Sequence, residues 1–80
     1  MIEKEEKEKK VISIIRDILS DENMESEMEI AESTKLKEDL GFDSLMLAVL
    51  TVKIENEFDV DVFEDGLVFT VGEIFSKIAE

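Results

Sequence analysis

The 80-residue sequence contains no cysteine, no histidine and no proline. Without cysteine it has no disulfides and no thiolate metal sites, and without histidine it lacks the commonest catalytic base and metal ligand. Catalysis by a triad or dyad is therefore nearly excluded. The N-terminus "MIEKEEKEKK" has no apolar signal segment, and no stretch approaches the length of a membrane span. We expect a cytoplasmic protein with no catalytic residues and no metal site.

Basic residues are scarce as well. Nine of them stand against 22 acidic residues, which gives a formal net charge of −13. This charge would repel a phosphate backbone and an anionic bilayer, so neither nucleic acid nor membrane is an expected partner. With 44% apolar residues beside 39% charged ones, an amphipathic globular fold is favoured over disorder. We expect one monomeric domain over 1–80, whose charged stretch 1–10 is either helical or frayed.

Apolar spacing predicts an all-α fold. The apolar residues of 11–19 recur on one helical face, and glutamate-lysine pairs at i, i+4 could extend this first helix back towards Glu3. The pattern fails over 21–43, which predicts a long ordered loop with one helical turn that Gly41 closes. The side chains expected to pin this loop to the core are Leu36, Leu40 and Phe42.

Two further helices follow the loop. The second is expected from Ser44 to about Phe58, and the last over 71–79, because Thr70 and Glu73 form a T-x-x-E capping box. The acidic segment between them fits a linker with a short helical turn, since no second strand is available to pair with it.

The predicted second helix is apolar around most of its circumference. One face is assigned to the core: Leu47, Leu50, Thr51, Ile54 and Phe58. In so small a protein the other apolar side chains cannot all be buried, so some should face solvent or a partner unless a loop covers them. These are Leu45, Met46, Ala48, Val49 and Val52.

Ser44 stands at the start of this helix, where a serine is ordinarily an N-cap. Asp43 can cap the helix itself, which would free the adjacent hydroxyl to point outward. Local physics alone leaves both interpretations open.

The run "LKEDLGFDSLMLAVLTVKIENEFDVDV", residues 36–62, resembles the acyl carrier protein family, whose members carry a D-S-L signature at the start of their second helix. The resemblance extends over the order of elements in the whole chain. It implies a four-helix bundle with a short third helix. It also implies that a phosphopantetheinyl transferase attaches 4'-phosphopantetheine to Ser44, with Asp43 and Leu45 completing the signature.

The implied function is to hold acyl intermediates as thioesters and to deliver them to acyl-transferring, condensing or ligating enzymes in fatty-acid or specialised (polyketide or lipid) biosynthesis. Met46 and Val49 stand where fatty-acid carriers usually have acidic residues, so recognition is expected to rely more on apolar contact. The candidate docking residues are Leu45, Met46, Val49, Val52, Glu38, Asp39 and Glu55.

Two other functions remain open: an aminoacyl or peptidyl carrier of an adenylation-dependent pathway, and a cofactor-free acidic protein-interaction domain. A calcium-binding loop counted from Asp61 fails, because Phe63 and Gly72 occupy two of the three ligand positions tested. A hydrolase is disfavoured because "GFDSL" is not G-x-S-x-G and no base is available to activate the serine.

Overall fold

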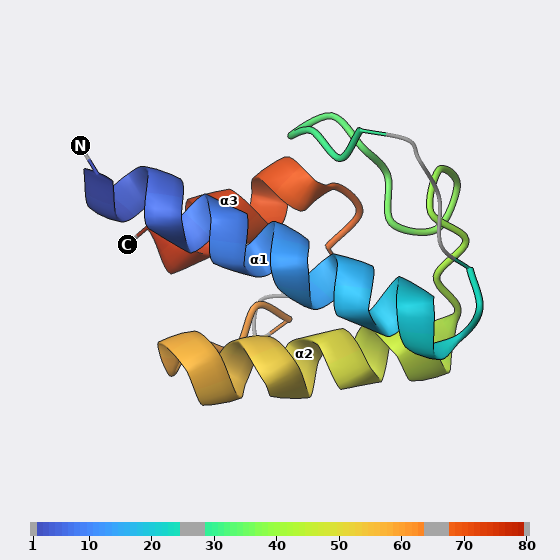
Figure 1. The fold of residues 1–80 in the computed structure, drawn as a ribbon. Coiled ribbons are helices and arrows are strands. Elements are labelled where there is room, and N and C mark those ends of the chain that lie inside the picture. The colour runs from blue at the N-terminus through green and yellow to red at the C-terminus, as the bar shows by residue number, and fades with distance from the viewer. Residues whose placement is uncertain (1, 25–28, 64–67, 80) are drawn as a thin grey trace.

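The computed structural model describes residues 2–24, 29–63 and 68–79. It contains helices α1 (Ile2–Asp21), α2 (Ser44–Phe58) and α3 (Val71–Ile78), joined by loops (Figure 1). Over these ranges the only extended pairing is an isolated antiparallel bridge between Lys35 and Thr70. The all-α prediction is thus confirmed for the described residues.

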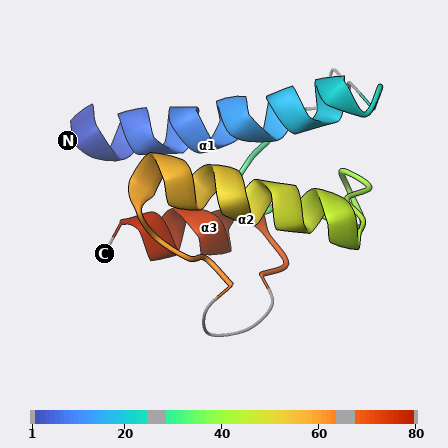
Figure 2. The same cartoon turned by 90° about the horizontal axis from the view of Figure 1, so that it is seen from below.

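The helices run side by side, and α1 contacts both α2 and α3. Figures 1 and 2 show that α2 runs antiparallel to α1, so that the end of α1 lies beside the start of α2. The start of α1 and the end of α3 both lie at the opposite end of the molecule. The start of α2, which carries the D-S-L signature, is therefore next to the last turn of α1.

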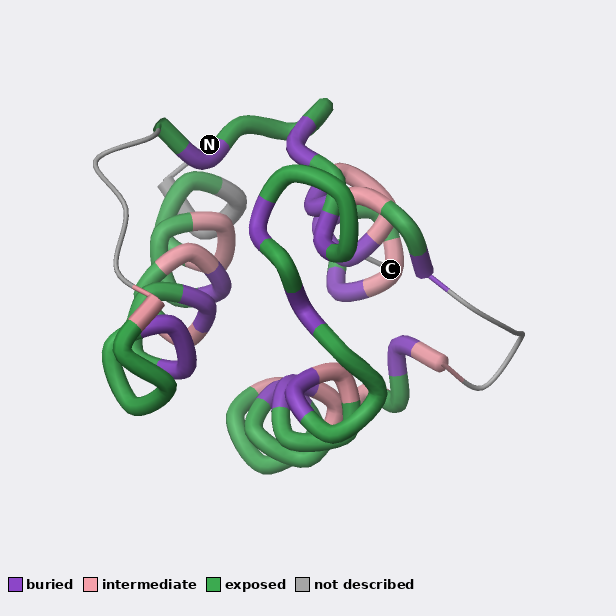
Figure 3. Tube along the Cα trace, turned by 90° about the vertical axis from the view of Figure 1, so that its right-hand side faces the viewer, coloured by how far each residue is buried: buried purple, intermediate pink, exposed green. Residues whose placement is uncertain are grey.

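Buried apolar side chains from all three helices and both loops form one core. Figure 3 shows that the buried residues of the helices lie on their inward faces. The predicted inner face of α1 is confirmed, with Ile12 and Ile14 packed at its margin. The core consists of Val11, Ile15, Ile18, Leu19, Ile30, Leu36, Leu40, Phe42, Met46, Leu50, Ile54, Val62, Val68, Val71, Ile74, Phe75 and Ile78.

The charged stretch at the N-terminus is helical, because α1 begins at Ile2. Two of its lysines tie α1 to the other helices. Lys7 Nζ donates to the carbonyl oxygen of Ile78 at 3.4 Å, and Lys10 Nζ lies 3.7 Å from a carboxylate oxygen of Glu57. The helical alternative for 1–10 is therefore correct over the described residues.

The predicted helical turn in the first loop is present and ends as expected. Gly41 adopts the left-handed conformation, with φ of 77°, and its N–H donates to the carbonyl of Lys37 at 3.0 Å. This is the αL termination that glycine makes at low cost. Leu36, Leu40 and Phe42 are all buried, as predicted. Residues 25–28 of this loop lie outside the described residues.

Backbone hydrogen bonds join this loop to the start of α3. The N–H of Leu36 donates to Phe69 at 2.9 Å, that of Val71 to Thr34 at 3.0 Å, and that of Gly72 to Glu32 at 2.8 Å. A Cβ at position 72 would lie 2.9 Å from the Glu32 carbonyl oxygen. The close approach of the loop explains why glycine occupies the second residue of a helix.

The start of α3 confirms the predicted capping box. The hydroxyl of Thr70 accepts from the N–H of Glu73, and the Glu73 carboxylate accepts from the N–H of Thr70. The helix buries Val71, Ile74, Phe75 and Ile78. It ends at Ile78 with Ala79 as its C-cap, one residue before the expected end.

The predicted third of four helices does not appear in the described part of the connection from α2 to α3, and residues 64–67 lie outside the described residues. Asp59 ends α2 in the left-handed conformation, with φ of 58°. Two residues later the Asp61 carboxylate accepts from the N–H of Phe63 at 3.0 Å. Such an aspartate turn competes with helix formation. The described residues therefore form three helices.

Candidate functional site

Ser44 is the first residue of α2 and is exposed to solvent. Asp43 precedes it in an extended conformation, φ −101° and ψ −177°, and acts as the N-cap. The Oδ1 of Asp43 accepts a hydrogen bond from the backbone N–H of Met46 at 2.8 Å. Capping of α2 is thus performed by Asp43, as the sequence allowed, and does not require the Ser44 hydroxyl.

Buried residues hold the serine in place on both sides. Phe42, two residues before it, is 2% exposed, and Met46, two residues after it, is 4% exposed. The N–H of Phe42 donates to the carbonyl of Leu36 at 3.0 Å, which fixes the loop immediately before the cap. Ser44 is therefore an exposed hydroxyl on a firmly packed segment.

An exposed apolar strip runs along α2 from the serine, formed by Leu45, Val49 and Val52. Their side chains are 70%, 37% and 59% exposed. Ala48 is exposed beside them. Contiguous apolar surface of this kind is characteristic of sites that contact other molecules.

Met46 was predicted to belong to this strip, and that prediction is wrong. It lies four residues before Leu50, which lies four before Ile54, so the three share one buried line along α2. Leu47 and Phe58, assigned to the core, are only partly buried and pack against it. The face of α2 that contacts the core therefore includes Met46 and is rotated about the helix axis from the predicted face.

The acidic residues that precede the serine have local structural contacts. Glu38 forms an ion pair of 3.2 Å with Lys35, and the Asp39 carboxylate accepts from the Lys35 N–H at 2.8 Å. Asp43 caps α2. Glu55 is exposed near the far end of the same helix. These interactions stabilise the segment that leads to the serine.

A hollow of about 200 Å³ lies between the end of α1 and the start of α2. Asp21 and Glu22 belong to its wall, and neither was identified from the sequence. A signal was nevertheless present, since two carboxylates at the end of a helix oppose its dipole. The lining residues are Ile18, Asp21, Glu22, Leu45, Met46 and Val49.

A family model described as "Phosphopantetheine attachment site" matches residues 10–74, which is most of the chain and includes the whole of α2. The chain belongs to the acyl carrier protein family. An acyl carrier protein of Thermotoga maritima is 39% identical over 70 residues, covering 85% of this chain and 86% of the relative. A solved structure assigned as an acyl carrier protein, from Mycobacterium tuberculosis, has a TM-score of 0.71 at 29% identity, over 91% of this chain and 95% of that chain.

Family membership identifies the cofactor as 4'-phosphopantetheine, since the matched model is the attachment site for that group. Acyl carrier proteins carry their cargo and do not catalyse its reactions. Within the described ranges, no group of three or more histidine, cysteine, aspartate or glutamate side chains could hold a metal ion. None of the helices in those ranges combines the length and the apolar content needed to cross a bilayer.

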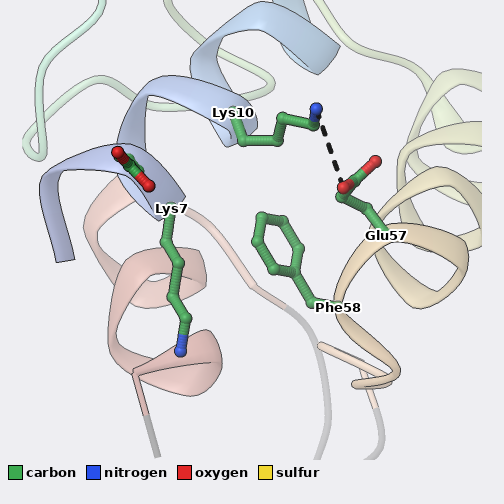
Figure 4. Close-up of a pocket in the computed structure, with 5 residues that line it drawn as sticks. Lys7, Lys10, Glu57 and Phe58 are labelled. Atoms are coloured by element: carbon green, nitrogen blue, oxygen red, sulfur yellow. Dashed lines mark ion pairs between the residues drawn. The ribbon is translucent and has the colours of Figure 1, made fainter. Parts of the chain in front are cut away.

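This carrier protein has a second hollow, of about 380 Å³, at the other end of α2 (Figure 4). It is lined by Glu6, Lys7, Lys10, Glu57 and Phe58. Figure 4 shows the ion pair between Lys10 and Glu57 above the Phe58 ring, while Lys7 extends towards the end of α3. Because these side chains tie the helices together, we assign this hollow a structural role.

Proposed function

We propose that this protein carries acyl groups as thioesters on a 4'-phosphopantetheine arm attached to Ser44, and delivers them to enzymes of fatty-acid or specialised lipid or polyketide biosynthesis. The observation that carries the proposal is the division of labour at the start of α2. Asp43 caps the helix through a 2.8 Å hydrogen bond, and the neighbouring serine is exposed. A transferase can therefore reach the hydroxyl without uncapping the helix.

Ser44 is exposed at the first residue of α2, and this position suits the formation of a phosphodiester bond. Its oxygen bonds to phosphorus, the pyrophosphate linkage of coenzyme A breaks, and adenosine 3',5'-bisphosphate leaves with the electron pair. The hydroxyl proton passes to a base of the transferase. The product is a phosphodiester at the N-terminus of α2, where free N–H groups and the helix dipole favour negative charge.

When attached, the group supplies a terminal thiol that holds acyl cargo as a thioester. The protein supplies position and recognition, so it needs no catalytic residue of its own. We propose the exposed strip of Leu45, Val49 and Val52 as the surface on which partner enzymes dock, with Glu38, Asp39 and Glu55 steering their approach. Modest apolar contact of this kind suits repeated transient encounters.

A second candidate is an aminoacyl or peptidyl carrier of an adenylation-dependent pathway. The observation that favours it is Val49, which is 37% exposed at a position where fatty-acid carriers usually have an acid. The two functions share the arm on Ser44 and differ in cargo. Mass analysis of the protein isolated from cells distinguishes them, because an aminoacyl cargo carries nitrogen that a simple acyl chain lacks.

The proposal is tested by incubating the protein with coenzyme A and a broad-specificity phosphopantetheinyl transferase. Intact-mass spectrometry should show one added phosphopantetheine on the wild-type protein and none on Ser44→Ala. Ser13→Ala removes an exposed serine of α1 and is the matched control, which should be modified like the wild type. An equal mass gain in Ser44→Ala would show that the arm is attached to another residue, and no gain in the wild type would leave a cofactor-free interaction domain as the better account.

A further inference from the structure

A hollow of about 460 Å³ lies where the first loop meets the start of α3. The residues that line it are distinct from those of the D-S-L signature and of the exposed strip on α2. An antiparallel bridge between Lys35 and Thr70, with backbone hydrogen bonds on either side of it, holds the two walls together. The lining residues are Lys35, Lys37, Glu38, Phe69 and Thr70.

Phe69 supplies this hollow with an aromatic ring that lies largely outside the core. Its side chain is 58% exposed, although a hydrophobic residue directly before a capping box often packs against the fourth residue of the helix. That residue, Ile74, is completely buried. The backbone of Phe69 is held on both sides, since its N–H donates to Glu73 at 3.2 Å and its carbonyl accepts from Leu36 at 2.9 Å. The ring therefore faces solvent from a fixed position.

The lysines make the hollow locally positive. The ammonium group of Lys35 pairs with Glu38 at 3.2 Å. Asp39 accepts from the backbone N–H of Lys35 and does not line the hollow. Lys37 is exposed and forms no ion pair within the described part of the chain. The lining residues thus have one positive charge without a partner, in a chain whose formal net charge is −13.

From this arrangement we infer that the hollow binds an apolar carboxylic acid in its ionised form, with the apolar body against the Phe69 ring and the carboxylate at the Lys37 ammonium group. The lysine stems extend the apolar surface of the ring. An ammonium group has only donors, and its hydrogen bonds to a carboxylate are among the stronger ones in proteins. The volume of the hollow lies within the range typical of small-molecule sites.

The charge of the rest of the protein restricts the ligand to a small one with a single negative charge. A nucleic acid or an acidic protein segment brings many negative charges, which a net charge of −13 repels. A phosphate monoester carries about −1.5 to −2 at pH 7. A monocarboxylate brings one charge, which matches the one ammonium group that Lys37 supplies.

A ligand in this position contacts both segments that form the hollow. Lys37 belongs to the turn that leads to the cap of α2, and Phe69 directly precedes the cap of α3. Binding should therefore strengthen the link between the first loop and α3. Hydrolysis of an acyl thioester releases an acid of this class, so an acyl carrier would encounter such ligands, but binding in the hollow does not require the arm on Ser44.

The test is a titration of the unmodified protein, labelled with nitrogen-15, with 4-phenylbutanoate and with its uncharged counterpart 4-phenylbutanamide. The amide signals of residues 35–37 and 69–70 report on the hollow in two-dimensional NMR spectra. We expect the carboxylate to shift these signals until they saturate, and the uncharged compound to bind at least fivefold more weakly.

Variants assign the two contacts. Phe69→Ala removes the ring and should raise the Kd for 4-phenylbutanoate at least fivefold, with Phe69→Leu intermediate because it keeps an apolar side chain. Lys37→Gln removes the charge and should raise the Kd at least threefold. Lys53→Gln makes the same change in charge at an exposed position of α2 that does not line the hollow, and should change the Kd less than 1.5-fold. Circular dichroism checks that each variant is folded.

Four results would overturn the inference. Equal binding of the uncharged compound would show that the ammonium group is not involved, and equal Kd values for Lys37→Gln and Lys53→Gln would show a response to total charge alone. Saturable shifts centred on Leu50 and Ile54 would place the ligand between the helices, and no saturable shift would show that the hollow does not bind it. None of these results bears on the proposed function, which is tested separately by modification of Ser44.

Discussion

The carboxylate of Asp43 and the backbone N–H of Met46 form a 2.8 Å hydrogen bond that spans the serine between them. Two adjacent residues thereby divide two tasks. Asp43 starts the helix, and Ser44 presents its hydroxyl to solvent. Since Met46 is anchored in the core, the bond also links the exposed serine to the packed interior.

Loss of this cap should destabilise the protein without removing the serine. We expect Asp43→Ala to lower the free energy of unfolding by about 0.5–2 kcal/mol, because the first turn of α2 loses an acceptor. Asp43→Ser retains a capping oxygen and should cost much less. Urea denaturation measures both values, and equal losses in the two variants would show that the cap is not the cause.

Gly72 should resist a substitution that normally strengthens helices. Alanine is better than glycine within a helix by about 1 kcal/mol, but its Cβ would lie 2.9 Å from the Glu32 carbonyl oxygen. We expect Gly72→Ala to lower the melting temperature, whereas Ser76→Ala, at an exposed site of the same helix, should leave it unchanged or raise it. A more stable Gly72→Ala protein would mean that the backbone at Glu32 moves away from the added Cβ at little cost.

The two apolar residues that stand in place of acids should respond differently to glutamate. Met46→Glu places a charge in the core and should cost about 3 kcal/mol or more, or prevent folding. Val52→Glu, on the exposed strip, should leave the circular dichroism spectrum and the melting temperature nearly unchanged. Val49→Glu should likewise keep the fold but slow transfer to partner enzymes. Unfolding of Val49→Glu would place that side chain in the core.

Salt should stabilise the protein. A net charge of −13 gives self-repulsion in the folded state, which counterions screen. Thermal melts followed by circular dichroism should therefore show a melting temperature that rises as sodium chloride increases from low to moderate concentration. A parallel series with an uncharged solute at matched osmolality separates the effect of charge from that of osmolality. A melting temperature that stays flat or falls with sodium chloride would contradict this explanation.

Much of the fold follows from short-range patterns. The spacing of apolar residues predicts α1, and the pair of Thr70 and Glu73 predicts the start of α3, because helical periodicity and capping depend on neighbours in sequence. The helical turn that Gly41 closes was predicted for the same reason. Ser44 and its cap were identified from the residues together with the family resemblance.

What the sequence did not predict depends on long-range contacts. A helix that is apolar on most sides has no distinct periodicity, so the core face of α2 was assigned wrongly at Met46. The bonds from Leu36 to Phe69 and from Gly72 to Glu32 join backbone groups, and the glycine at position 72 does not indicate which segment approaches it. Asp21 and Glu22 were missed because only the packing of α1 beside α2 brings them into one hollow with Leu45 and Val49.

Backbone hydrogen bonds join the first loop, which leads to Ser44, to the start of α3. A part of the chain that lacks α3 therefore lacks partners for this loop. A fragment that ends after α2 would keep the whole signature, yet Leu36 would lose its partner at Phe69 and the turn before Asp43 would lose its support. We expect such a fragment to be recognised poorly although its local sequence is intact. The signature is therefore contiguous in the sequence, but its presentation depends on residues near the C-terminus.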